Sequence, residues 1–479
     1  MSSIGVSGPA KLQAVTTLVN KLTEDLKSKS LSPEERDKAL EELKVYGRDP
    51  RSADPIFTKQ GIETLTKHAF DSPSDTTSRN ALRVLCNAML LIPETRQRFV
   101  DLGYESKACE KLKNDNWDDE FLATRVIFFS TYGTTVDLAK LIDEHHLAES
   151  MVANLARHAS RISEHAKNKT KPDPMELMAL GETLRLLFNV TSKCPSKVDC
   201  FTAAVPHIVT LLLSLDIPPP KGTPPLESPL GPLVNALMNL KLDSEEARSC
   251  LYPKDAPPSL AEKLITLLDL SLKAYSDQEL DATVTPLACI ISSIYENAPA
   301  DSPVRDFIRK SLLPSEEERN KVLGKGDTLP ARLLVNMTNP IAPEFARAVS
   351  HLLFNVSDKD ANKFVENIGY GYASGFLFQN NIPVPEGLGG DAEKGESSKA
   401  GQSSRRAVNP ITGQFLDTET FPDMPEMTME EKEREAERLF VLFERAKKLG
   451  IVNVENPVAK AVQEGRFEEL PDDYEEDSD

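Results

Sequence analysis

The residue types that usually carry catalysis or bind metals are scattered along this chain, without the spacing that such chemistry requires. The seven histidines, including the adjacent pair His145 and His146, do not combine with cysteine or carboxylate residues at the spacing of metal ligands. Neither a GxSxG nor an HExxH motif occurs. The cysteines form no CxxC pair, so we expect them to be reduced packing residues: Cys86, Cys109, Cys194, Cys200, Cys250 and Cys289. The sequence therefore predicts neither an active site nor a metal site.

Two glycine-containing segments have some likeness to nucleotide-binding loops. In GYGYASG (369–375) the glycine spacing differs from a dinucleotide fingerprint, and no strand is predicted before it. The segment GKGDT (324–328) lacks the rest of a phosphate-binding loop. Both segments are predicted to be turns between helices, and no cofactor is expected.

Asparagines stand within four similar apolar phrases. The phrase LRVLCN ends at Asn87, LRLLFN at Asn189 and VNALMN at Asn239, and HLLFNV contains Asn355. An amide on a packed helix needs hydrogen-bond partners, because burying it unpaired costs about 1 to 3 kcal/mol. Two interpretations stay open: each asparagine ties adjacent repeats together, or it lies on an inner face and binds a partner peptide.

Basic residues accompany the first of these phrases. Lys44 and Arg48 are four residues apart and so are predicted to share a helix face, while Arg83 and Arg125 lie within or beside apolar stripes. Together with Arg332 they would form a basic lining that suits a carboxylate or an acidic helix of a partner. The alternative is that each is a solvated residue at a helix edge.

The phrases themselves indicate repeated amphipathic helices that cannot bury their apolar faces alone. Their intervals accommodate helical repeats of about 40 to 47 residues with insertions. From residue 1 to residue 378 we therefore predict an all-α, armadillo-like or HEAT-like solenoid, an architecture typical of binding proteins.

Composition narrows the class of partner. The net charge of −19 over 479 residues argues against binding of nucleic acid through phosphate contacts, so proteins are the expected partners. The chain begins without a basic segment followed by an apolar core, and it contains no run of about 18 apolar residues. A soluble, intracellular, monomeric protein with no direct membrane insertion is expected.

The amino-acid composition of the chain changes after residue 378. Residues 379–427 are rich in glycine, serine and charge and are predicted to be a flexible linker that contains NPITG. An amphipathic helix is predicted over 428–450, where Thr428 and Glu431 have capping-box spacing, and the acidic tail 451–479 is expected to be disordered. Acidic neighbours make Ser315 and Ser478 candidate phosphorylation sites.

Several phrases together resemble the synembryn family over most of the chain: LKVYGRDPRSADP, ALRVLCNAMLLIP, ETLRLLFNVTSK, KFVENIGYGYASG, VNPITG and MTMEEKEREAERLFVLFERAKKLGIV. The resemblance implies an armadillo/HEAT solenoid that binds heterotrimeric G-protein alpha subunits. Such proteins act as chaperones for alpha subunits and as guanine nucleotide exchange factors. They stabilise a nucleotide-free alpha subunit whose C-terminal helix lies in a concave groove, and they use no covalent chemistry.

The resemblance also implies roles for individual residues. Its motifs place partner-binding positions at Lys44, Arg48, Asn87, Arg125, Phe188 and Asn189, and, in a more divergent segment, at Arg332 and Asn336. It further implies a cytoplasmic location, with recruitment to the plasma membrane through the alpha subunit. The alternative is an armadillo-type adaptor for another helical or extended protein.

Overall fold

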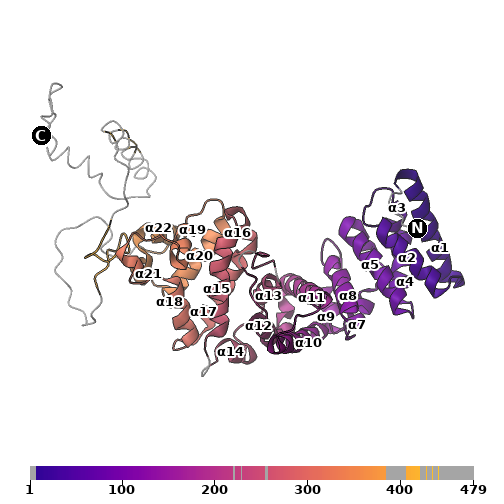
Figure 1. Cartoon of the computed structure of the whole chain (residues 1–479), viewed down its shortest axis with the longest axis horizontal. Coiled ribbons are helices and arrows are strands. Elements are labelled where there is room, and N and C mark those ends of the chain that lie inside the picture. The colour runs from indigo at the N-terminus through magenta and orange to yellow at the C-terminus, as the bar shows by residue number, and fades with distance from the viewer. Residues whose placement is uncertain are drawn as a thin grey trace. The chain divides into compact units, whose positions relative to one another are not determined.

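The computed structural model describes residues 7–219, 222–227, 229–253, 257–383 and 406–420, together with Thr428, Arg434, Arg438 and Val441. Helices dominate these residues (Figure 1), and the β structure within them is one isolated bridge between Val408 and Phe415. The prediction of an all-α fold is therefore confirmed.

The chain divides into two compact units. Unit 1 contains residues 1–312 and 335–356, and unit 2 contains residues 313–334 and 357–479. This division differs from the single solenoid expected over 1–378, because residues 313–334 group with later residues such as Glu366, Asn367 and Phe415.

Unit 1 has a first row of seven helices in which each helix packs on the next. Figure 1 shows α5, α8 and α11 of this row as neighbours. The row carries the asparagine phrases, and their leucines, such as Leu82, Leu85 and Leu187, are completely buried. In order along the chain, the row consists of α2 (Pro33–Tyr46), α5 (Asp75–Leu91), α8 (Trp117–Ser130), α11 (Pro174–Lys193), α13 (Leu230–Leu237), α17 (Thr285–Asn297) and α20 (Pro343–Val356).

The longer of the remaining helices of unit 1 cover the other side of its core, and they make the second row: α1 (Gly8–Ser28), α4 (Lys59–Phe70), α10 (Leu147–Asn168), α12 (Ala204–Ser214), α15 (Ser259–Ala274) and α18 (Pro303–Leu312). Short helices connect the rows: α3 (Asp54–Phe57), α6 (Glu94–Val100), α7 (Glu105–Lys111), α9 (Leu138–Asp143), η1 (Pro195–Phe201), α14 (Glu245–Leu251) and α16 (Asp277–Thr283). Each repeat thus completes its core with its neighbours, as a solenoid requires.

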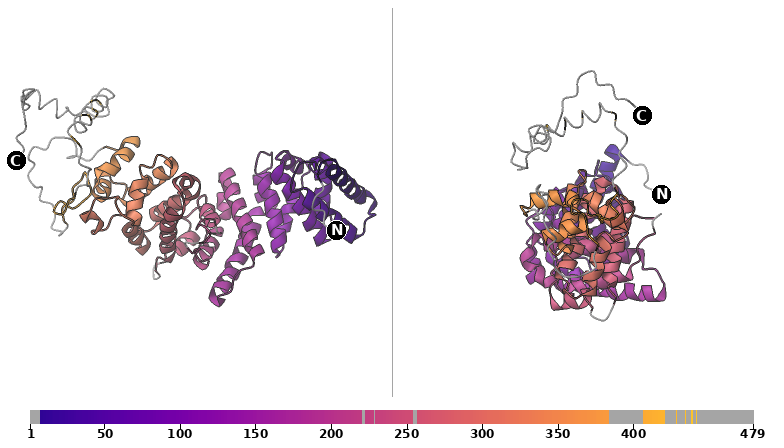
Figure 2. Two further views of the ribbon diagram at one scale, coloured as in Figure 1. Left: turned by 45° about the horizontal axis from the view of Figure 1, so that its top comes forward. Right: turned by 90° about the vertical axis from the view of Figure 1, so that its left-hand side faces the viewer.

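Local sequence determines where many of these helices begin. Ser32 and Glu35 form a reciprocal capping box at the start of α2, and the side chains of Asn116 and Asp173 cap α8 and α11. In the left view of Figure 2 the helices of unit 1 follow one another in chain order, as their colours show. Because these caps satisfy backbone N–H groups that lack an intrahelical partner, they fix the ends of the helices that carry the predicted site.

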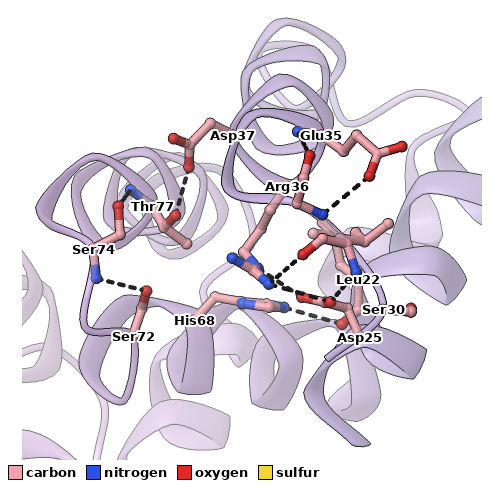
Figure 3. Close-up of polar contacts among 12 residues, drawn as sticks. Leu22, Asp25, Ser30, Glu35, Arg36, Asp37, His68, Ser72, Ser74 and Thr77 are labelled. Carbon is pink, nitrogen blue, oxygen red and sulfur yellow. Dashed lines mark hydrogen bonds and ion pairs between the residues drawn. The ribbon is translucent and has the colours of Figure 1, made fainter. Parts of the chain in front are cut away.

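A buried polar cluster joins α1, α2 and α4 (Figure 3). The Arg36 guanidinium donates to both carboxylate oxygens of Asp25, with Nε 2.6 Å from Oδ2, and His68 Nε2 lies 3.0 Å from the carbonyl oxygen of Leu22. Burial lowers the pKa of His68, so its imidazole is neutral at pH 7 and donates this hydrogen bond through Nε2. The cluster thereby holds α1, α2 and α4 together.

Unit 2 contains η2 (Glu318–Asn320), α21 (Ala361–Ile368), α22 (Tyr370–Gln379) and most of α19 (Leu329–Asn336). Residues 406–420 pack on it. The backbone N–H groups of Tyr370 and Gly371 donate to the carbonyl oxygens of Pro410 and Ile411, at 2.8 and 3.1 Å. This part of the chain therefore differs from the flexible linker expected over 379–427, because it caps the first turn of α22.

Arg319 anchors this contact. Its guanidinium is buried and donates to the carbonyl oxygens of Glu366, Asn367 and Gly413 at 3.0, 2.8 and 2.8 Å. We call residues 406–420 the clasp. The helix predicted over 428–450 lies almost entirely outside the described residues, and the tail 451–479 lies wholly outside them.

None of the helices in the described ranges is by itself long and apolar enough to span a membrane. The consecutive helices η1 and α12, bent by 67°, reach the required length and composition only as a pair.

Candidate functional site

The structure brings five of the predicted partner-binding residues together on α2, the loop that follows it, α5 and α8. Lys44, Arg48, Arg83, Asn87 and Arg125 line one open groove with a volume of about 430 Å³. We call it the basic groove. Its remaining lining is mostly apolar and consists of Cys86, Asp118, Phe121, Leu122, Met175 and Met178.

The positive charges of the basic groove differ in how far they are neutralised. Arg83 pairs with Asp118 at 2.6 Å, and Arg125 pairs with Glu182 at 2.8 Å. Lys44 and Arg48 form no ion pair with any residue that the structure describes. The groove thus retains positive charge at its α2 end.

Arg125 is held in a fixed position on α8. Its guanidinium lies 5.5 Å from the centre of the Phe121 ring and 5.2 Å from that of Phe129, and Glu182 accepts its hydrogen bond. Cation–π contacts and the carboxylate of Glu182 on α11 together fix the planar group. A rigid guanidinium loses little entropy when it binds a partner.

Arg48 does not continue α2 as its spacing from Lys44 suggests. The helix ends at Tyr46, and Arg48 follows the C-cap residue Gly47. Lys11 of α1 fixes the segment that follows, because its Nζ donates to the carbonyl oxygens of Asp49 and Arg51, both at 2.7 Å. Arg48 reaches the basic groove from this loop, and Lys11 is a positioning residue that the sequence did not indicate.

Three of the four asparagines have the tying role, and the binding role of Asn87 stays a prediction. Asn189 is only 8% exposed and donates to Thr131 Oγ1 at 2.9 Å, while Asn239 donates to Phe188 O at 3.2 Å and Asn355 donates to Ser292 Oγ at 2.7 Å. These three amides tie helices of the first row together. Asn87 lines the basic groove, and its side chain has no hydrogen bond within the described residues.

Three predicted residues are not among those that line the basic groove. Phe188 is half-buried on α11, where its carbonyl accepts from Asn239. Arg332 belongs to unit 2 and pairs with Asp327, and the side-chain oxygen of Asn336 accepts from Asn339 at 3.0 Å. The structure thus gives each of them contacts within its own unit.

Comparison with known proteins assigns the family. The model of the family described as guanine nucleotide exchange factor synembryn matches residues 39–466. The chain belongs to the synembryn family.

This family member is similar in sequence to proteins that are named chaperones. It is 24% identical to chaperone Ric-8A of Macaca fascicularis, over 87% of this chain and 81% of that protein. It is 25% identical to chaperone Ric-8A of Xenopus tropicalis, over 92% and 86% of the two chains. It is also 25% identical to a synembryn-like chaperone of Schizosaccharomyces pombe, over 81% and 76%. These matches confirm the family resemblance of the sequence phrases.

Among solved structures, a designed armadillo repeat protein is similar to this synembryn family member with a TM-score of 0.36 and 15% identity, over 53% of this chain and 99% of the other. An engineered protein matches with a TM-score of 0.38 and 19% identity, over 58% and 97%. The packing of the two helix rows is what assigns the solenoid fold here.

Sequence reasoning missed the apolar wall of the groove in this synembryn family member. Met178 is 50% exposed, and it lies with Met175 and Phe121 beside the cations. Methionine side chains adapt to different apolar partners. The available signal was the pair of methionines at helical spacing after the cap Asp173.

His158, Glu120 and Glu176 form a buried cluster of titratable residues that includes the first turn of α11. His158 Nε2 is 3.0 Å from Glu120 Oε1, and its Nδ1 is 3.6 Å from Glu176 Oε1. Burial alone would lower the pKa of His158, but the contacts with the two carboxylates outweigh burial and raise it. His158 of α10 thereby links Glu120 of α8 to Glu176 of α11.

The remaining candidates are metal ligands, the Cys86 thiol and the two serines predicted to be phosphorylated. In the described part of the chain, no group of histidine, cysteine and carboxylate residues could hold a metal ion. Burial raises the pKa of the Cys86 thiol to about 12, so this groove residue is not a nucleophile. Ser315 is exposed and exchanges hydrogen bonds with Glu318 at the start of η2, whereas Ser478 lies outside the described residues. Phosphorylation of either serine stays a prediction.

Proposed function

We propose that this chain binds heterotrimeric G-protein alpha subunits and that the basic groove holds the C-terminal helix of the alpha subunit. The observation that carries the proposal is that, among the residues the structure describes, Lys44 and Arg48 have no ion pair and lie beside an Asn87 amide that has no hydrogen bond. A C-terminal carboxylate satisfies both, and the apolar side of an amphipathic helix packs on Met175 and Met178.

Exchange follows from selective binding of one conformation. A groove that holds the last helix away from the rest of the alpha subunit stabilises a state with a loosened guanine pocket, so GDP is released. By linkage, nucleotide binding weakens the complex by the same free energy, and GTP discharges the alpha subunit. The partner is thus bound in its GDP-bound or nucleotide-free form, and this chain needs no nucleophile or general base.

Chaperoning uses the same groove. An amphipathic helix exposes its apolar side until its own domain is complete, and the apolar wall covers that side during folding. We further propose that the chain acts as a monomer in the cytoplasm and reaches the plasma membrane through its alpha subunit.

The test is GDP release from a purified alpha subunit, measured with a fluorescent nucleotide, with and without this protein. We expect faster release and a nucleotide-free complex that GTP disperses. Arg48→Ala should reduce the acceleration about tenfold or more, because a charge-assisted hydrogen bond contributes about 1.5 to 3 kcal/mol. Lys140→Ala is the matched control, since Lys140 is exposed on α9 and does not line the groove.

Two outcomes would contradict the proposal. Binding to alpha subunits that is equally strong in Arg48→Ala would remove the basic groove from the mechanism. Absence of binding to any alpha subunit, with a folded protein, would favour the alternative of an armadillo-type adaptor for another protein.

A further inference from the structure

Helix α22 of unit 2 carries large apolar side chains on two opposite sides. Its sequence YGYASGFLFQ contains no charged residue. Ala373, Phe376 and Leu377 are buried on one side, where the Phe376 ring meets that of Phe364 edge-on at 5.6 Å. The opposite side exposes Gly371, Gly375 and Phe378, and Phe378 is 67% exposed. Large apolar side chains on two opposite sides of a helix are normally both covered.

The two glycines on this side are not required by the fold of unit 2. A Cβ atom at Gly375 would meet nothing within 4 Å, and one at Gly371 would meet only the carbonyl oxygen of Ile411 at 3.6 Å. Glycine inside a helix nevertheless destabilises it by about 1 kcal/mol relative to alanine. Glycines one turn apart leave a strip of bare backbone, which another chain segment can approach closely.

Large apolar side chains border this strip. Ile411 of the clasp is 60% exposed and is fixed beside Gly371, whose N–H donates to its carbonyl oxygen at 3.1 Å. Phe378 stands two turns further along α22. We call Gly371, Gly375, Phe378 and Ile411 the glycine face. Exposed apolar groups gathered around bare backbone are typical of a contact surface.

We propose that the glycine face is the docking site of this chain's own segment 428–450, packed as an amphipathic helix when no partner is bound. The clasp delivers the segment to this place, because Thr420 is hydrogen-bonded to Gln414 at 3.1 Å. From Thr420 to Thr428 the chain can span at most about 28 Å, so the segment starts close to unit 2. Tethering also gives it a millimolar effective concentration.

The apolar side of the segment 428–450 and the uncharged glycine face are chemically complementary. The segment is predicted to present Leu439, Phe440 and Phe443 on one side and charged residues on the other. The glycine face carries no charge, so it accepts the apolar side of the segment and not the charged side. In the proposed docked form, an aromatic ring of the segment packs on the glycine strip between Ile411 and Phe378. The inference concerns the free chain and is independent of the proposed binding of alpha subunits.

Hydrogen exchange of the full chain, without partner and at two protein concentrations, tests the docking. Amides of 428–450 should exchange at least about tenfold more slowly than an unstructured segment, at either concentration. Gly375→Gln should remove this protection while α22 itself stays protected, because a Cβ atom at this position meets nothing within 4 Å. Lys363→Ala, which alters an exposed residue of α21, is the matched control and should leave the protection unchanged.

A photo-crosslinking residue in place of Phe378 gives a second readout that does not depend on the glycine variant. We expect it to crosslink to peptides of 428–450 within the same chain. Unprotected amides in 428–450, protection that persists in Gly375→Gln, or protection that rises with protein concentration would each overturn the proposal. The last outcome would instead identify a second copy of the chain as the occupant.

Discussion

Asn87 and Asn189 end similar phrases, LRVLCN and LRLLFN, but their surroundings are opposite. The amide of Asn189 is buried and bonded to Thr131 of the preceding helix in the first row. The amide of Asn87 faces the basic groove and has no hydrogen bond within the described residues. One residue type at one motif position therefore serves stability in one repeat and is available for binding in another.

Alanine substitutions should separate these two roles. Asn189→Ala removes the hydrogen bond that Thr131 Oγ1 accepts and should lower the free energy of unfolding by about 1 to 3 kcal/mol. Asn87→Ala should change stability by less than about 0.5 kcal/mol but weaken alpha-subunit binding about tenfold. Denaturant unfolding and titration with a purified alpha subunit measure both quantities. Equal stability losses in the two variants would contradict the division of roles.

The charge of His158 makes stability depend on pH. The imidazole faces Glu120 from α8 and Glu176 from α11, while His165 on its own helix also approaches Glu176, at 3.9 Å. Because its pKa in the folded protein is raised above 6.5, the folded state binds the proton more tightly than the unfolded state. The stabilisation is complete below the unfolded pKa and is lost as pH rises through the folded pKa.

His158→Gln should therefore lose this pH dependence. We expect the wild-type protein to unfold at a higher temperature than the variant near pH 6, and the difference to shrink as pH rises towards 9. Thermal unfolding followed by circular dichroism at several pH values measures it. Parallel curves for the two proteins would show that His158 does not titrate in the folded state.

At the scale of elements, the clasp is a packed part of unit 2. Gly413 has a φ of +74°, and a Cβ atom there would come within 2.7 Å of Leu323 Cδ1 and 2.9 Å of the Gly369 nitrogen. Its carbonyl oxygen also accepts from the buried Arg319. The NPITG phrase is thus explained by a tight turn packed against the start of α22 rather than by a flexible connection.

Gly413→Ala should detach the clasp. The strained φ and the close contact should destabilise unit 2 by about 2 kcal/mol or more. Hydrogen exchange should speed up over α21 and α22 but stay unchanged over α5 and α8 of unit 1. Gly103→Ala serves as a control with an equally positive φ but open space around the new Cβ atom. Similar exchange in both variants would show that the contact is unimportant.

At the scale of the whole molecule, two truncations distinguish folding from exchange. A chain that ends after residue 425 keeps the clasp, so we expect both units to remain folded while stimulation of GDP release weakens. A chain that ends after residue 405 loses the contacts of Arg319 with Gly413 and should also expose α22 to proteolysis. Full exchange activity in the longer truncation would exclude a role for 428–450 in exchange.

The sequence by itself determined the helical repeats, the all-α class and the family, because amphipathic periodicity and local motifs are written in neighbouring residues. It also indicated Lys44, Arg83, Asn87 and Arg125, since charge beside an apolar stripe is visible without coordinates. It could not separate Asn87 from Asn189, because hydrogen-bond partners come from helices distant in the chain.

Only the tertiary structure decided the remaining features. Arg48 reaches the basic groove from a loop that Lys11 holds, 38 residues before Asp49 in the chain. The clasp is bound through Arg319, which lies 94 residues from Gly413. Periodicity reports which side of a helix is apolar, but not which distant segment covers it. The contacts that position the groove and the clasp are of this long-range kind, and they depend on how the helices pack.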